Sequence, residues 1–192
     1  MKLISKTSAL AVLLAPALAF ADGNATLEEY GASVSLGGGV VQFLDSKTRA
    51  FTSQGSAWEG RLAFGTRKTV AVEVGYLGSL HAIDGGLDAN AHLVSTTFET
   101  ALRFNIGTGP IQPFVVAGAG WAYYNLTKSM AAADVGDHDS ILVVPLGFGV
   151  GVKHHDWSCD ARVIYRASEL VDLFPDARLD SWSATLRVGY EY

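Results

Sequence analysis

The last eleven residues of the chain, Trp182 to Tyr192 (WSATLRVGYEY), alternate between apolar and small or polar side chains. A period of two is typical of a β-strand, and it gives this strand one apolar face. A strand at the end of a chain leaves an unpaired edge unless another strand covers it, and in a closed barrel the last strand pairs with the first. The terminal strand therefore favours a barrel.

The first 21 residues predict a secretory signal peptide. Lys2 and Lys6 give a basic start, residues 9–20 form an apolar core, and Ala19-Phe20-Ala21 has the small residues of a cleavage site. We expect residues 1–21 to be removed, residues 22–29 to form a short periplasmic lead, and residues 30–192 to form one domain.

Composition excludes several classes of protein. Hydrophobic residues make up 49% of the chain, yet no segment after residue 21 has the roughly 18 continuous apolar residues of a transmembrane helix. Without residues 1–21 the formal charge is (14 − 2) − 19 = −7, which disfavours nucleic acid as a partner. Cys159 is the only cysteine, so no intrachain disulfide can form.

Eight segments show the alternating pattern, and the connections between them are alternately long and short. This rhythm predicts an all-β fold, a transmembrane eight-stranded antiparallel up-and-down β-barrel with tight turns at the periplasmic end and four long extracellular loops. Glycines 37–39 of the first strand suggest a bulge. The expected strands are residues 30–41, 58–64, 70–76, 92–106, 111–124, 142–153, 159–166 and 182–192.

The face opposite the apolar one carries small residues and a balanced set of charges. A soluble, lipocalin-like barrel with its apolar face inward is the alternative, but its exterior would be crowded with polar side chains. Small residues with balanced charge favour a narrow lumen in which ions are paired. The expected lumen charges are Glu59, Arg61, Glu73, Glu99, Arg103, Asp160, Arg162, Arg166, Arg187 and Glu191.

Aromatic residues of the apolar face fall near the two ends of the expected strands. Such girdles form where amphipathic rings meet the two lipid–water interfaces. The loop-end girdle is expected to contain Trp58, Tyr76, Trp121, Tyr123, Tyr165 and Trp182. The turn-end girdle is expected to contain Tyr30, Phe64, Phe104, Tyr190 and Tyr192.

Three stretches resemble the small eight-stranded outer-membrane barrels typified by the OmpA transmembrane domain and OmpX. They are residues 113–121 (PFVVAGAGW), Ile164-Tyr165-Arg166, and the aromatic-ended final strand. The resemblance implies a location in the cell outer membrane of a Gram-negative cell, contact with membrane lipid and lipopolysaccharide, and recognition of the final strand by the outer-membrane assembly machinery. These motifs indicate the class of barrel and no particular function.

We expect a monomeric, non-enzymatic barrel without cofactor or metal, whose lumen is filled by side chains and whose loops have a structural or surface-interaction role. Two alternatives stay open: a lipid A-modifying enzyme of deacylase or acyltransferase type, and a narrow small-solute channel. His154 and Ser158 suggest a hydrolase, but they lie in a short turn without an obvious acid partner. The long loops are acidic, which suits either simple solvation or a divalent cation.

Overall fold

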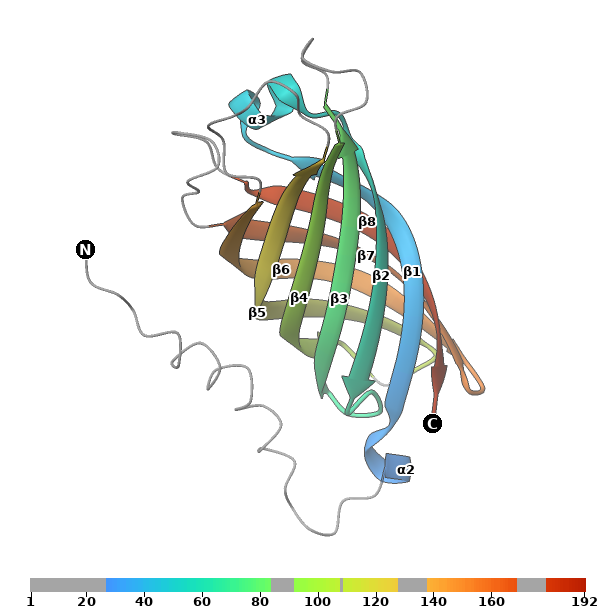
Figure 1. Cartoon of the computed structure of the whole chain (residues 1–192). Coiled ribbons are helices and arrows are strands. Elements are labelled where there is room, and N and C mark those ends of the chain that lie inside the picture. Colours follow the sequence, from blue (N-terminus) through green and yellow to red (C-terminus); the bar gives the residue numbers. More distant parts are fainter. Residues whose placement is uncertain (1–26, 84–91, 108, 128–137, 169–178) are drawn as a thin grey trace, which may run out of the picture.

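The computed structural model describes residues 27–83, 92–107, 109–127, 138–168 and 179–192, so the expected signal peptide lies outside the described residues. Each strand pairs antiparallel with the next, and β1 pairs with β8, which closes the barrel (Figure 1). The predicted fold is confirmed. The strands are β1 (Ala32–Phe43), β2 (Gly55–Phe64), β3 (Val70–Ala82), β4 (His92–Asn105), β5 (Ile111–Thr127), β6 (His138–His154), β7 (Trp157–Ser168) and β8 (Ser181–Glu191).

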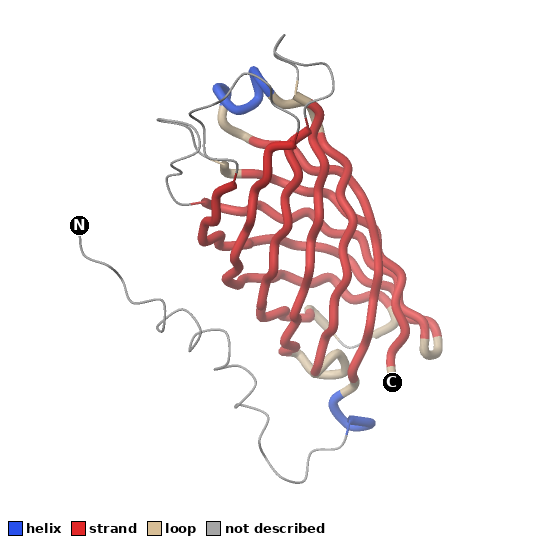
Figure 2. The backbone as a smooth tube through the Cα atoms, viewed as in Figure 1, coloured by secondary structure: helices blue, strands red, loops and turns tan. Residues whose placement is uncertain are grey.

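The two ends of the barrel differ. Three tight turns join β2 to β3, β4 to β5 and β6 to β7 at one end, where the C-terminus also lies (Figures 1 and 2). The long connections and the short helix α3 (Ser46–Phe51) lie at the other. We call these the turn end and the loop end. Neither α3 nor α2 (Leu27–Tyr30) is long enough to cross a membrane.

Strand β8 closes the barrel in a regular register, from Ser33 opposite Glu191 to Phe43 opposite Ser181. The bulge expected at residues 37–39 is wrong, because both neighbours of β1 pair through this segment without an extra residue. The backbones of β1 and β8 approach each other closely at Gly39. A Cβ at this position would lie 1.9 Å from the Ala184 carbonyl oxygen, which explains the glycine.

Several boundaries differ from the sequence prediction, and most strands extend farther toward the loop end than expected. Tyr30 ends α2 rather than opening a strand, and Gly31 turns the chain into β1 with φ of +74°, which favours glycine. Helix α3 occupies part of the polar segment expected to be loop; the Asp45 side chain caps it by accepting a hydrogen bond from the Thr48 N–H. Strand β3 continues to Ala82, beyond the expected Tyr76.

The outer surface of the barrel is apolar. Leu36, Phe148 and Leu186 expose 71, 63 and 65% of their surface, whereas the charged residues between the outward positions are buried. The soluble alternative requires the opposite facing and is therefore excluded. We call this exposed apolar surface the apolar belt. Its side chains are of the kind that contact the hydrocarbon core of a bilayer.

The inner face has two different halves. Toward the loop end, buried apolar side chains form a cluster that includes Phe43, Leu93, Tyr124 and Leu179. Leu179 comes from the connection before β8, so part of the loop end packs into the mouth of the barrel. Toward the middle and the turn end, the inner face carries the charged residues. We refer to the first group as the mouth cluster; the sequence analysis did not predict it.

Candidate functional site

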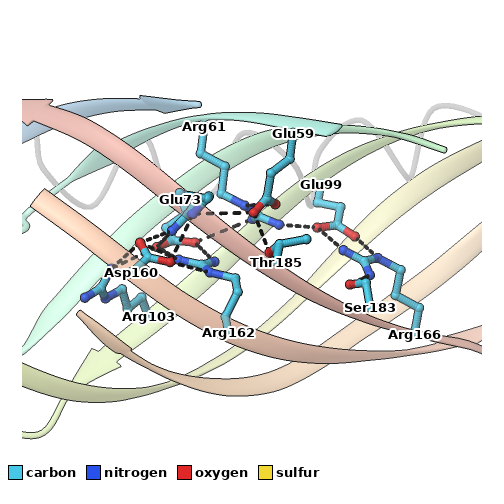
Figure 3. A network of polar contacts seen from close by, with 11 residues as sticks. Glu59, Arg61, Glu73, Glu99, Arg103, Asp160, Arg162, Arg166, Ser183 and Thr185 are labelled. Atoms are coloured by element: carbon cyan, nitrogen blue, oxygen red, sulfur yellow. Dashed lines mark hydrogen bonds and ion pairs between the residues drawn. The ribbon is translucent and has the colours of Figure 1, made fainter. Parts of the chain in front are cut away.

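All ten residues expected as lumen charges are buried, with no residue more than 9% exposed. Nine of them belong to one continuous network of ion pairs and hydrogen bonds across the barrel interior, most of which is drawn in Figure 3. Alternation brings them there, because every second residue of a strand points to the same face.

Glu73 of β3 is the centre of this network. Its carboxylate accepts two hydrogen bonds from Arg162 of β7, at 2.8 and 3.2 Å. Arg61 and Arg103 each approach it to 3.5 Å. Arg187 Nη2 lies 3.9 Å away, so four guanidinium groups surround one carboxylate whose side chain is 1% exposed.

Asp160 and Glu59 link the network to β8. Arg187 donates to Asp160 from Nη2 at 2.6 Å and from Nε at 3.1 Å, and Arg162 donates to the same carboxylate at 3.2 Å. Glu59 accepts from the Thr185 hydroxyl at 2.7 Å and lies 3.5 Å from the Nε of Arg187. Side chains of β8 therefore contact β7 and β2, in addition to the backbone pairing of β8 with β1.

Glu99 forms the loop-end side of the network. It is in direct contact with Arg166 of β7, and Arg61 donates to it at 2.8 Å. Arg166 also donates to the Ser183 hydroxyl at 2.7 Å. Arg61 bridges Glu99 and Glu73, so the two halves of the network are one unit.

Glu191 is buried but belongs to a second cluster at the turn end. Its carboxylate lies 2.7 Å from Lys153 Nζ and 3.1 Å from Arg67 Nε. Neither Lys153 nor Arg67 was among the expected lumen charges, because both lie in or beside tight turns. Their contact with the end of β8 shows that turn residues fold over the lumen.

Phe114 is a further residue that the sequence analysis missed. Its ring is 1% exposed, and the guanidinium carbons of Arg103 and Arg162 lie 3.8 and 4.9 Å from the ring centroid. Such cation–π contacts stabilise arginines in a poorly hydrated site. Gly149 provides the space, since a Cβ there would meet the Phe114 ring at 2.5 Å.

The aromatic residues expected as girdles are all partly or well exposed. Trp58, Tyr123 and Tyr192 expose 44, 52 and 63% of their surface. Phe98 and Trp157, at 54 and 60%, lie on the same surface, although the sequence analysis named neither as a girdle residue. Trp58, Tyr165 and Trp182 lie near the loop ends of their strands and Phe64, Phe104 and Tyr190 near the turn ends, whereas Tyr76 lies in the middle of β3.

The suggested pair of His154 and Ser158 does not form a reactive site. His154 lies opposite Trp157 and Lys153 lies opposite Ser158, so the histidine and the serine point to opposite faces of the hairpin. In the described ranges, no three His, Cys, Asp or Glu side chains are grouped so as to hold a metal ion. The acidic loop residues lie largely outside those ranges.

Comparison with known proteins identifies the fold. The attachment invasion locus protein Ail of Yersinia pestis matches with a TM-score of 0.58 and 13% identity over 84% of this chain and 98% of its own. Neisserial surface protein A matches with a TM-score of 0.65 and 10% identity over 84 and 97%. The N-terminal barrel of Pseudomonas aeruginosa OprF gives 0.52 and 15% over 83 and 97%.

The fold is that of the small outer-membrane β-barrels. This confirms the predicted resemblance, and the apolar belt agrees with a location in the outer membrane. No protein-family model matches the sequence, and no curated protein is similar to it. At 10–15% identity the similarity establishes the architecture, and the role of this barrel must come from its own residues.

Proposed function

We propose that the protein is a non-enzymatic outer-membrane barrel with a closed lumen, which anchors its loop end at the cell surface for structural or surface interactions. The observation that carries this proposal is the filling of the lumen. Charged side chains from β2, β3, β4, β7 and β8 meet in its middle, and the mouth cluster packs above them.

A filled lumen argues against conduction. Ions would have to separate Glu73 from four arginines and then pass between buried apolar side chains. An eight-stranded barrel is just wide enough for its side chains to fill it. We therefore expect purified protein in planar bilayers to give no stable single-channel current. Large, steady currents, or swelling of liposomes in small solutes, would favour the channel alternative.

The described residues also offer little for catalysis. Among them, a serine hydroxyl and a histidine ring meet where Ser79 Oγ lies 3.3 Å from His81 Nε2, and both residues are at most 1% exposed inside the barrel. A substrate would have no access to this pair. Mass spectrometry of lipid A from cells with and without the gene tests the enzyme alternative: identical acylation supports the proposal, and a change in acyl chains contradicts it.

The loop end has an ordered base on which a surface could be presented. Thr52 forms a bridge with Ile83, and the Ser53 N–H donates to the Ala82 carbonyl, which ties the segment after α3 to the end of β3. The Asp180 carboxylate accepts from the N–H and hydroxyl of Ser168, joining β7 to the start of β8. These contacts hold together the described residues at the loop ends of the strands.

The proposal includes processing and assembly. We propose that residues 1–21 are removed as a signal peptide, that the barrel is monomeric, and that its outer belt contacts lipid and lipopolysaccharide. We also propose that the assembly machinery recognises β8 and the following Tyr192, which is 63% exposed at the turn end. Heat-modifiable migration of the protein from an outer-membrane fraction tests the assembled state; migration unchanged by boiling would contradict it.

A further inference from the structure

A small cavity lies in the lumen between the charge network and the turn end. Its volume is about 30 Å³, and its walls include Gln112, Arg187 and Asp160 together with the turn-end residues Lys153 and Glu191. We call it the turn-end chamber. It is separate from the mouth cluster, which fills the opposite end of the barrel.

Four buried polar atoms of the chamber walls have no hydrogen-bond partner in the part of the protein that the structure describes: Thr66 Oγ1, Gln112 Oε1, Arg187 Nη1 and Glu191 Oε2. Glu191 Oε2 nevertheless forms an ion pair with Lys153 Nζ at 2.7 Å. The two that belong to the least exposed residues are Gln112 Oε1, an acceptor, and Arg187 Nη1, a donor; each residue is 3% exposed. The Nε and Nη2 atoms of the same guanidinium are fully engaged with Asp160. Buried polar atoms are almost always paired with protein or with ordered water, so both atoms point to a bound molecule.

The charges around the chamber indicate that this molecule is neutral. Three carboxylates (Glu73, Asp160 and Glu191) and three cations (Arg103, Lys153 and Arg187) line it. An anion beside Arg187 would face the carboxylates and leave the Gln112 oxygen unpaired. A cation beside Gln112 would face the arginines and leave Arg187 Nη1 unpaired. Water satisfies both atoms, because it donates and accepts.

The size and surroundings of the chamber agree with water. One buried water needs at least about 10–15 Å³, so 30 Å³ holds one or two. On the turn side, the Lys153 and Arg67 side chains are 21 and 41% exposed and so reach solvent. On the other side, Arg162 and Glu73 are 0 and 1% exposed.

We propose that the turn-end chamber is a hydration site that holds one or two water molecules between Gln112 and Arg187 and exchanges them with solvent at the turn end only. The turn-end half of the lumen is then hydrated, and the loop-end half contains no exchanging water. The Arg187–Asp160 side of the network exchanges protons with the solvent of the turn end. The Arg166–Glu99 side, which lies toward the mouth cluster, does not.

Solvent exchange of arginine Nε–H groups, measured by NMR on ¹⁵N-arginine-labelled full-length mature protein in micelles, tests this directly. Arg187 and Arg166 have similar ion-pair partners and burial, so burial alone predicts similar rates. We expect the Arg187 Nε–H to exchange at least about tenfold faster than that of Arg166. Equal rates, or faster exchange at Arg166, would overturn the proposal.

The substitution Gln112→Leu removes the acceptor and should dry the chamber, slowing Arg187 exchange about tenfold toward the Arg166 value. Thr97→Val, a buried polar-to-apolar change in the loop half of the lumen, is the matched control and should leave Arg187 unchanged. An unchanged Arg187 rate in Gln112→Leu contradicts the site.

A crystal structure of the wild-type protein keeps the test independent of whether Gln112→Leu assembles. Ordered water density between Gln112 and Arg187 supports the proposal. An empty chamber contradicts it, and so does an anomalous peak in the chamber after a bromide soak, which would show an anion site instead.

Discussion

Arg162 and Glu73 form a two-hydrogen-bond ion pair across the lumen although they lie 89 residues apart and on strands that are not neighbours, β7 and β3. The two bonds measure 2.8 and 3.2 Å, and the side chains are 0 and 1% exposed. A bidentate contact of this kind fixes both side chains. It therefore braces opposite walls of the barrel in addition to the backbone ladder.

Loss of the Glu73 charge should be strongly destabilising. In Glu73→Gln the side chain keeps its shape, but Arg162, Arg61 and Arg103 lose their common counter-ion in a buried site. Breaking a buried ion pair from one side costs about 3–5 kcal/mol. We expect the free energy of unfolding, measured in urea by tryptophan fluorescence, to fall by about this amount.

A surface ion pair provides the control for this measurement. Glu29 lies 3.0 Å from Lys68, but both side chains are largely exposed, at 60 and 40%. Glu29→Gln should therefore change the free energy of unfolding by less than about 1 kcal/mol. Equal effects of Glu29→Gln and Glu73→Gln would show that the lumen pair is no more important than a solvated one.

The closure of the barrel depends on Gly39. In Gly39→Ala the new Cβ would lie 1.9 Å from the Ala184 carbonyl oxygen and 2.8 Å from the Thr185 Cα, and both are backbone atoms that cannot turn aside. We expect the β1–β8 pairing to be weakened and the barrel to lose about 1–3 kcal/mol or fail to close. The heat-modified mobility of the folded barrel measures this closure.

Gly60→Ala is the matched change. A Cβ at position 60 meets only the Leu36 Cδ2 atom at 3.3 Å, and a leucine on the outer face can move. This variant should fold as the wild type does. If Gly39→Ala folds equally well, the close approach of β1 and β8 is not limiting.

The architecture could be predicted because alternation is a local property. Each strand shows its apolar and polar faces within a few residues, and long and short connections alternate along the chain, so strand number, facing and burial of the charges required no knowledge of distant contacts. Arg187 and Leu186 are an example: these neighbours in sequence point to opposite faces of β8 as expected, and they are 3 and 65% exposed.

The remaining features depend on residues far apart in sequence. The partners of Glu73 come from β2, β4, β7 and β8, and no spacing in the sequence specifies them. The mouth cluster was not predicted because its members lie near the loop ends of strands. Phe43 lies beyond the expected end of β1, and Leu93 and Tyr124 lie near the ends of β4 and β5. Helix α3 has a sequence signal, the cap residue Asp45, but it is too short to show helical periodicity.

The facing of β8 can be tested by adjacent substitutions. Leu186→Arg places a charge on the lipid face and should cost about 2–4 kcal/mol if the residue lies near the middle of the bilayer. Arg187→Leu removes a partner of Asp160 inside the lumen and should also lower stability. Folding yield into lipid vesicles measures both effects.

Leu186→Phe is the control for β8, because the lipid face accepts a larger apolar side chain that a packed interior would reject. It should assemble normally. Normal assembly of Leu186→Arg, or failure of Leu186→Phe, would mean that β8 faces the other way.

The cap of α3 should give the loop end a dependence on pH. The backbone N–H of Thr48 donates to the Asp45 carboxylate at 3.0 Å and lowers the pKa of Asp45 below its usual value. A lowered pKa means that the folded helix favours the ionised carboxylate, so the contribution of the cap is present above the ordinary carboxyl pKa. It is lost as the pH falls through the lowered value.

The amide chemical shift and hydrogen exchange of Thr48, followed by NMR between neutral and acidic pH, measure this change. We expect α3 to lose protection at acidic pH while the barrel strands stay protected. Asp45→Asn is the matched variant, because asparagine caps a helix without a titrating group, and it should remove the pH dependence while keeping the helix. A Thr48 transition of the same size in Asp45→Asn would assign the pH dependence to another group.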